Sequence, residues 1–557
     1  MARSATLDMT QGSLGRQIIG FSLPLMFTNL LQMLFSMVDL AVVGRFSSSA
    51  AMGSVGSTTT LIFLFTGFLM GLGSGVNVLV ATHFGARSEK NVRESVHTSF
   101  LVCLIAGFLM LALGLIFARP LLELLNTRDD LIDGAELYLR IYFLGMPAAA
   151  LYNYGNGVLN AIGDTKTPLI FLSTAGVLNV ILDLVFVIGL GMSTDGVALA
   201  SMLSQCVSAG LIVRSLMRSK EIYSLSLKEV RFHKDKAIHA LSVGVPAGLQ
   251  NAIFSVANLF IQAGVNSFST VVVEGNSAAG NVDNLVYSVM NAFYIACSSF
   301  VGQNYGAGKS RRVLKSYLLT LCYSAVAAAV LGVLFLLFGH QFLSLFTSES
   351  DVIEAGLARI WVMCFSFPIS ATMDCTTAAR GLGKGLVPMI FVFLGSCVFR
   401  VAWIYTVFAH FHTIRSLYML YPFSWVLTGA AEIAYFLYCY KKYVKPLDAS
   451  GMKKSCPKGQ LFFCDHTGRV CFFALVRTPQ KFSQLLQSCQ LAVFVIRVPR
   501  HLAEHGDLLR QRGTVLPVLE QHGLFRAEGV HVDLTAAVGE DEAVLGLAHG
   551  RERRVAL

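Results

Sequence analysis

The sequence contains few charged residues: Asp, Glu, Lys and Arg make up 14% of its 557 residues, whereas 54% are hydrophobic and the mean hydropathy is +0.62. Soluble domains carry roughly 25% charged residues. The composition therefore excludes the several soluble domains that the length alone would allow. Tryptophan is also scarce, with 3 residues against 40 Phe and 49 Gly, which is typical of lipid-facing and closely packed helices. These values indicate a polytopic membrane protein.

Motifs of metal-binding, nucleotide-binding and hydrolytic proteins are missing. The 12 cysteines include no Cys-x-x-Cys pair, and most lie in or beside apolar runs, so we predict no disulfide framework. GAGKS at Gly306–Ser310 resembles the end of a phosphate-binding loop, but Gln303 stands where that motif needs glycine, so we interpret it as a tight turn. Neither an HExxH motif nor a nucleophile elbow occurs. We expect no enzyme activity and no cofactor.

Twelve segments are long and apolar enough to span a membrane, which takes about 20 residues each. They lie near residues 17–43, 52–82, 96–118, 133–160, 168–190, 195–217, 238–265, 275–301, 314–339, 354–379, 387–410 and 416–440. The sequence therefore predicts an all-α polytopic membrane protein with twelve transmembrane helices.

Lysine and arginine are distributed unevenly between the two sides of these spans. With the N-terminus in the cytoplasm, 22 of them in residues 1–445 lie on the cytoplasmic side and four lie outside. The positive-inside rule favours this orientation, with both ends of the membrane region cytoplasmic, in the inner (plasma) membrane of the cell. Topology thus accounts for the net charge of +10, and we predict no nucleic-acid partner.

Residues 446–557 have a different composition. They contain 14 Lys and Arg and 11 Asp and Glu, and no uninterrupted apolar run of 20 residues. We interpret them as a cytoplasmic tail of unknown function, either disordered or a non-native extension.

Four landmarks recur at an offset of 220–222 residues. The pairs are Pro24 with Pro246, HFGARS at 83–88 with NYGAGK at 304–309, Pro147 with Pro368, and GDTKTPLIF at 163–171 with GKGLVPMIF at 383–391. Each repeat holds six spans, an even number, so the halves share one orientation and should be related by a pseudo-two-fold axis along the membrane normal. We predict a cytoplasmic N-terminus (1–16), a six-helix bundle (17–217), a linker (218–237), a second bundle (238–445) and the tail. Two facing bundles favour transport by alternating access.

Ionisable residues inside spans are costly, so each is a candidate functional residue. Asp39 and Asp183 fall at similar depths in the outer half of the first bundle, and Asn179 lies one helical turn before Asp183. Asn156 and Ser201 could add neutral oxygens. Such a set suits Na⁺ or a shared proton. The alternative is a polar packing network without an ion.

The repeat places no acid at the corresponding positions of the second bundle, so we expect coupling to be asymmetric. That bundle has its own candidates, Asp374, Arg400, Asp283 and Glu432. Asp374 and Arg400 could form a structural pair or contact substrate. Asp283 could face the cleft or make a polar bond between helices.

The opening DMTQGSLGRQIIGFSLPLMFTNLLQMLFSMVDLAVVGRF resembles that of the multidrug and toxic compound extrusion family, and HFGARSEKNV, VGQNYGAGKSRRV, GDTKTP and GLGKGLVP resemble its paired loops. The resemblance covers residues 8–445. It implies two six-helix bundles and cation-driven export of drugs and organic cations. The acids of spans 1 and 5 resemble the DinF-like prokaryotic branch, which implies a cation site at Asp39, Asn156, Asn179, Asp183 and Ser201. It also implies a bend in span 1 at Pro24.

Three functions follow from these observations. The first is a secondary multidrug exporter, acting as a monomer in lipid, that antiports drugs against Na⁺ or H⁺. The second is a lipid-linked oligosaccharide flippase, for which few basic residues are available in the spans. The third is a membrane-anchored protein whose activity lies in the tail.

Overall fold

The computed structural model describes residues 7–375 and 378–447, apart from the side chains of residues 49 and 374–375, and seven short strands between residues 460 and 556. The chain divides into two compact units, Met1–Lys445 and Pro446–Leu557. Each is described by itself.

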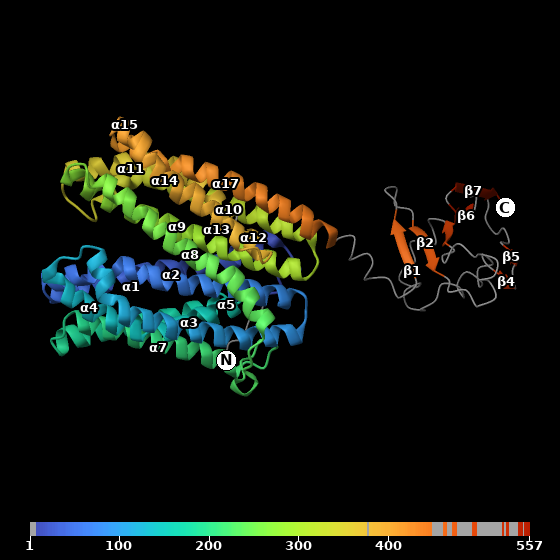
Figure 1. Ribbon diagram of the computed structural model, residues 1–557, viewed down its shortest axis with the longest axis horizontal. Coiled ribbons are helices and arrows are strands. Elements are labelled where there is room, and N and C mark those ends of the chain that lie inside the picture. Colours follow the sequence, from blue (N-terminus) through green and yellow to red (C-terminus); the bar gives the residue numbers. More distant parts are fainter. Residues whose placement is uncertain are drawn as a thin grey trace. The chain divides into compact units, whose positions relative to one another are not determined.

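The first half of the larger unit is a bundle of helices joined by short turns (Figure 1). Its helices are α1 (Leu14–Phe46), α2 (Ser49–Gly85), α3 (Glu89–Leu124), α4 (Asp129–Leu144), α5 (Met146–Ala161), α6 (Lys166–Leu184) and α7 (Thr194–Arg218). A π-helical turn, Val185–Gly189, extends α6. The predicted fourth span is formed by α4 and α5 together, because Pro147 in the first turn of α5 cannot continue the hydrogen bonding of α4.

The second half is a corresponding bundle that begins after the short 3₁₀ helix Leu227–Glu229. Its helices are α8 (Lys234–Val265), α9 (Thr270–Gly306), α10 (Ser310–Leu343), α11 (Ser350–Cys375), α12 (Ala378–Gly381), α13 (Leu386–Val392), α14 (Phe399–Trp403), α15 (Ala409–Phe411), α16 (Ile414–Tyr418) and α17 (Leu420–Cys439). π-Helical turns at 393–398 and 404–408 join α13, α14 and α15 into one rod, and another at 440–444 follows α17. The two bundles together provide twelve membrane-crossing units.

Ten of these units are single described helices long and apolar enough to cross a membrane. The two others are the interrupted ones, α4 with α5 and α16 with α17. Large apolar side chains also lie exposed on the outer flanks of the bundles, among them Ile116 and Leu337, each about two-thirds exposed. Exposed apolar surface on this scale requires a lipid environment, and the protein is therefore an integral membrane protein.

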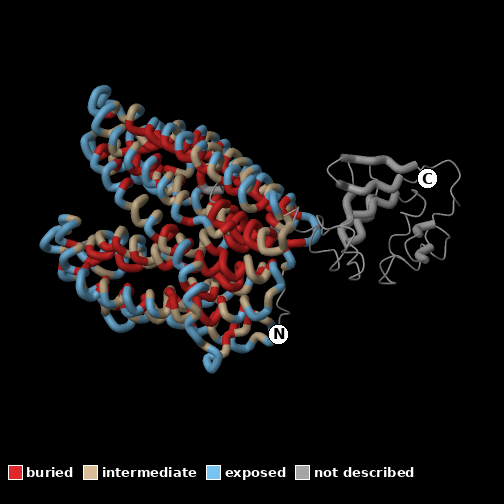
Figure 2. The backbone as a smooth tube through the Cα atoms, turned by 45° about the vertical axis from the view of Figure 1, so that its right-hand side comes forward, coloured by how far each residue is buried: buried red, intermediate tan, exposed pale blue. Residues whose placement is uncertain are grey.

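The two bundles contact each other at one end, which we call the basic end. It holds the turns at 86–88 and 307–309 and most of the lysines and arginines. Here a core cluster joins the first half of α1, from Leu14 to Leu25, to Phe293 and Phe300 of α9. At the opposite end, the core clusters on α1 and α9 contain residues of a single bundle each. The bundles therefore meet at the basic end and diverge away from it (Figure 2).

The helices α2 and α9, which are equivalent in the two repeats, cross at the basic end. Asn77 and Ser299 exchange hydrogen bonds of 3.0 and 3.1 Å across the crossing. A Cβ atom on Gly85 would lie 2.0 Å from the Gln303 carbonyl oxygen, and one on Gly306 would lie 1.9 Å from the Thr82 carbonyl oxygen. The reciprocal contacts place this crossing on the pseudo-two-fold axis, and both glycines are required because backbone meets backbone.

The segment before α1 lies across the basic end as a strap, residues 7–12. Its Leu7 amide donates to the Ile162 carbonyl of the first bundle (3.2 Å), whereas its Met9 amide donates to Gln303 of the second (3.1 Å). Arg312 donates to the carbonyls of Met9 and Gln11, each at 3.0 Å. Met9 is completely buried. The strap thus ties the two bundles together.

The strap should loosen in acid. Burial raises the pKa of the Asp8 carboxyl, but hydrogen bonds from Thr10 and the charges of Arg87 and Lys309 outweigh it, so this pKa lies below its usual value. A lowered folded-state pKa contributes stability that is present above the usual aspartate value, about 4, and is lost as the pH falls through the lowered value. We expect amide exchange at Met9, relative to its intrinsic rate, to rise over that range.

The matched variant is Asp8→Asn. It should show faster exchange at Met9 already at neutral pH and no further rise on acidification. The same acid-dependent step in Asp8→Asn as in the unmodified protein would assign the step to another group.

In the second unit, the described residues after Leu447 form strands only. They are β1 (Gln460–Cys464), β2 (Val470–Leu475), β3 (Val493–Arg497), β4 (Arg526–Glu528), β5 (His531–Asp533), β6 (Val544–His549) and β7 (Arg551–Ala556). They pair antiparallel as β1-β2-β3, β4-β5 and β6-β7. Among the described residues, helical structure therefore ends at Leu447. The rest of the tail outside these strands, which was expected to be disordered or a non-native extension, lies outside the described residues.

Candidate functional site

Two buried carboxyl groups meet inside the first bundle. The carboxyl groups of Asp39 on α1 and Asp183 on α6 lie close enough to interact directly. Ser201 on α7 donates from Oγ to Oδ2 of Asp39 at 3.3 Å. Asp183 is completely buried, and Ser201 and Asn179 are nearly so. Three helices far apart in the sequence therefore converge on one acidic pair.

Most polar atoms of this pair lack a donor. Oδ1 of Asp39 and both carboxylate oxygens of Asp183 are buried without a hydrogen-bond donor among the described residues. The amide nitrogen of Asn179 is likewise buried without an acceptor. Two adjacent carboxylates in a low-dielectric environment cannot both remain charged without compensation. The pair must hold a proton between its carboxyl groups or bind a cation, and its donor set of hard oxygens fits Na⁺.

Two tyrosines on α4 border the acidic pair. Tyr138 is hydrogen bonded to Ser201 and lies close enough to both acids for an electrostatic interaction. Its ring stacks on that of Tyr142, with centroids 6.1 Å apart, and Tyr142 is hydrogen bonded to Gln205 of α7. No lysine or arginine in the described part of the chain forms an ion pair with either acid. The site is therefore acidic and apolar.

The second bundle holds a different set of charges. Nη2 of Arg359 on α11 lies 2.5 Å from Oδ2 of Asp283 on α9, and Arg359 also donates to Asn276. Arg400 on α14 donates from Nε to Ser424 of α17 at 3.1 Å. Glu432, also on α17, is buried. This bundle therefore contains buried arginines, in contrast to the acidic pair of the first bundle.

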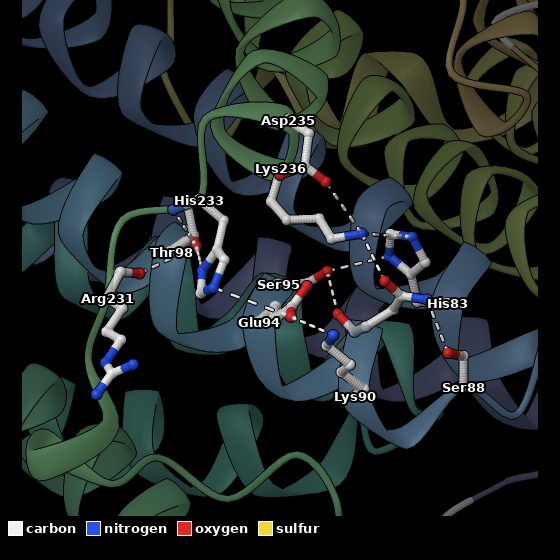
Figure 3. Close-up of polar contacts among 11 residues, drawn as sticks. His83, Ser88, Lys90, Glu94, Ser95, Thr98, Arg231, His233, Asp235 and Lys236 are labelled. Carbon is white, nitrogen blue, oxygen red and sulfur yellow. Dashed lines mark hydrogen bonds and ion pairs between the residues drawn. The ribbon is translucent and has the colours of Figure 1, made fainter.

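The linker attaches the start of α8 to the first bundle (Figure 3). Lys236 donates to Asn91 of α3 at 2.7 Å, and its Nζ lies 3.4 Å from Nε2 of His83 on α2. The backbone amide of His233 donates to Thr98 at 3.2 Å. The first helix of the second bundle is therefore held at its basic end by helices of the first.

The sequence and architecture resemble those of known proteins. The family model MatE matches two segments, residues 24–185 and 246–406, one in each bundle. The chain belongs to the MatE family. The matched segments begin at Pro24 and Pro246, the first pair of landmarks in the internal repeat.

Known relatives of this MatE protein include transporters. It is 28% identical over 397 residues to the "Probable multidrug resistance protein YpnP" of Bacillus subtilis (strain 168), covering 71% of this chain and 88% of that protein. It is 24% identical over 385 residues to the "FAD transporter" of Shewanella oneidensis, covering 68% and 84%. A solved MATE transporter described as an "outward-facing conformation" superposes with a TM-score of 0.74 at 20% identity, covering 81% of this chain and all of that one. The last comparison supports the fold, twelve helices in two bundles.

The structure of this MatE protein brings together Asp39, Asp183 and Ser201, as expected, with Asn179 buried one turn before Asp183. It does not bring Asn156 to them. That side chain accepts a hydrogen bond of 3.1 Å from Asn160 near the basic end of α5, whereas Asp183 lies at the far end of α6. Tyr138 is not predictable as a site residue from the sequence, because tyrosines four residues apart on a helix are more often core residues.

The remaining candidates are placed as follows. α1 continues as one helix through Pro24, which is buried and whose carbonyl accepts from Thr28 at 2.9 Å. Asp283 makes a bond between helices, which was one of its two expected roles. Arg400 hydrogen bonds to Ser424, and the Asp374 side chain lies outside the described residues. GAGKS forms the turn between α9 and α10, with Gly308 at a φ of 69°.

Proposed function

We propose that this MatE protein is a secondary active efflux transporter that antiports drugs or organic cations against Na⁺ or H⁺ by alternating access. The observation that carries the proposal is the acidic pair, Asp39 with Asp183, buried without a cationic partner among the described residues. A site of this kind must take up and release a cation whenever its access to solvent changes. The named multidrug resistance relatives favour drugs as the exported substrate.

The arrangement of the bundles supports alternating access. By the positive-inside rule, we assign the basic end to the cytoplasmic side of the membrane. Because the bundles contact each other at that end and diverge at the other, we assign the structure to the outward-facing state. Protonation or Na⁺ binding would neutralise the pair and change how α1, α6 and α7 pack around it. A cation shifts the equilibrium between two states only through different affinities for them. The acidic pair supplies that difference in affinity if its negative charge is neutralised by the cation in one state and is exposed to solvent in the other.

The protein acts as a monomer in the inner (plasma) membrane, with both ends of the membrane region cytoplasmic. A flippase is less well supported, because such a substrate needs a basic cavity. Of the three arginines expected in the spans, Arg140 is paired with Glu136 at 2.6 Å and Arg359 with Asp283.

Ethidium efflux from cells that lack their own exporters tests this function. Efflux should follow an imposed pH gradient in Na⁺-free buffer if H⁺ is the coupling ion, or a Na⁺ gradient with a protonophore present if Na⁺ is. A chain that ends at Lys445 should retain efflux, which would assign the activity to the larger unit. Efflux no faster than in cells with an empty vector, under both gradients, would contradict the proposal.

A further inference from the structure

Arg400 is a buried cation for which no described residue supplies an acidic partner. It lies on α14, faces α8 and α17, and is 3% exposed. Its only hydrogen bond to a described residue runs from Nε to Ser424. The guanidinium carbon lies 4.9 Å from the centroid of the Tyr421 ring and 5.9 Å from that of Phe254. The two terminal nitrogens therefore have no acceptor among the described residues, although they carry most of the hydrogen-bond donors of the group.

The neighbouring arginine shows what a compensated charge looks like in the same bundle. Arg359 binds Oδ2 of Asp283 through both Nε, at 3.2 Å, and Nη2, at 2.5 Å. Both arginines contact the same ring, since Arg359 lies 5.5 Å from the centroid of Tyr421. The cluster of Arg359, Asp283, Tyr421 and Arg400 thus carries one uncompensated positive charge.

The other acids of this bundle lie at different depths. Glu432 follows Ser424 by eight residues on α17, a rise of about 12 Å. The Asp374 side chain lies outside the described residues. The position of Glu432 is not level with the ring that the two arginines share. An isolated cation at this depth is costly, and such residues mark substrate pathways more often than they stabilise a fold.

We propose that Arg400, with Tyr421 and Phe254, forms a subsite for the anionic group of an aromatic substrate, either a carboxylate or a phosphate. This inference rests on the proposed function and specifies its substrate class. A guanidinium presents a planar fork of donors that matches either anion, and the two flanking rings favour an aromatic ligand. With the acidic pair in the first bundle, the transporter would offer charges of opposite sign in its two bundles and would accept zwitterionic substrates.

Transport of two probes by the full chain tests the subsite. Norfloxacin carries a carboxylate as well as an amine, whereas ethidium is a cation without an acid. In Arg400→Gln we expect norfloxacin efflux to fall at least about tenfold, with ethidium efflux within about twofold of the unmodified protein. Arg140→Gln, which removes one exposed positive charge from the first bundle, is the matched control and should change neither. Equal loss of both probes in Arg400→Gln would overturn the inference and make Arg400 a structural residue.

Binding to the purified full chain gives an independent readout. Benzoate and phenyl phosphate supply the two anions on the same ring, so a rise in the unfolding temperature with one of them identifies the anion preferred. The rise should be absent in Arg400→Gln, whose unfolding temperature without ligand should be unchanged or higher, because an uncompensated charge has been removed. No rise with either compound in the unmodified protein would overturn the subsite. If ethidium is not exported but the rise occurs, the proposed transport function fails and the subsite stands.

Discussion

Asp39→Asn and Asp183→Asn should each reduce cation-driven efflux at least about tenfold, which corresponds to about 1.4 kcal/mol of lost coupling free energy. Asparagine preserves the shape of the side chain but removes the charge that a proton or Na⁺ neutralises. A site that no longer distinguishes the loaded from the empty state cannot shift the equilibrium between the two conformations. The effect should appear as slow ethidium efflux at equal expression under either gradient.

The structure also predicts what these variants leave intact. Because Asp183 is buried without a hydrogen-bond donor among the described residues, its replacement should not lower the unfolding temperature. Asp133→Asn is a suitable control: it removes the same charge from an exposed carboxylate that pairs only with Arg119 at 3.1 Å. Normal efflux rates in both Asp39→Asn and Asp183→Asn would contradict the coupling mechanism.

Gly85→Ala and Gly306→Ala should also have large effects, because they act on the crossing of α2 and α9. Each new methyl group would lie far inside van der Waals contact with a carbonyl oxygen of the opposite helix, at 2.0 and 1.9 Å respectively. Since the opposing atoms are backbone, relief requires the two helices to separate. Overpacking of this kind costs about 1–3 kcal/mol or more. The cost destabilises the outward-facing state, in which the bundles contact each other at the basic end. That state should become less populated, and efflux should fall.

Amide exchange can localise this effect. Residues 77–85 and 299–306 should exchange faster in both variants, whereas α3 and α10 should be unaffected. The control is Gly210→Ala on α7, where an added Cβ would meet nothing within 4 Å. In that position alanine should be neutral or stabilising by up to about 1 kcal/mol, because it has the higher helix propensity. Unchanged exchange and efflux in Gly85→Ala would show that the crossing is looser than the structure indicates.

The features that depend on the lengths of apolar runs, on the internal repeat and on the depth of a residue in its span could be predicted from the sequence. The twelve spans follow from the lengths of apolar runs, and the two bundles follow from the repeat that begins at Pro24 and Pro246. The acidic pair was predictable because Asp39 and Asp183 are costly residues at matching depths. The spans, the bundles and the depths of the two acids each follow from the positions of residues along the chain alone.

Features that depend on helix rotation could not be predicted. Arg359 and Asp283 pair because α9 and α11 turn these side chains toward each other, and sequence position gives depth but no rotation. Tyr138 was missed because whether a tyrosine borders a core or a polar site depends on what the facing helices present. Asn156 is a different case: it was expected near the acids although its depth, near the basic end of α5, differs from that of Asp183 at the far end of α6. The strap was also missed, since its contacts with Arg312 join residues 300 positions apart.

The attachment of each bundle's first helix to the other bundle has a consequence for biogenesis. α1 is held near its start by α9, and α8 is held near its start by α2 and α3. While the chain is being synthesised, the first half enters the membrane long before α9 exists, so the apolar face from Leu14 to Leu25 has no partner during that interval. Neither repeat is therefore a complete folding unit. The N-terminal segment can be fixed only after α9 and α10, which carry its partners Gln303 and Arg312, have entered the membrane.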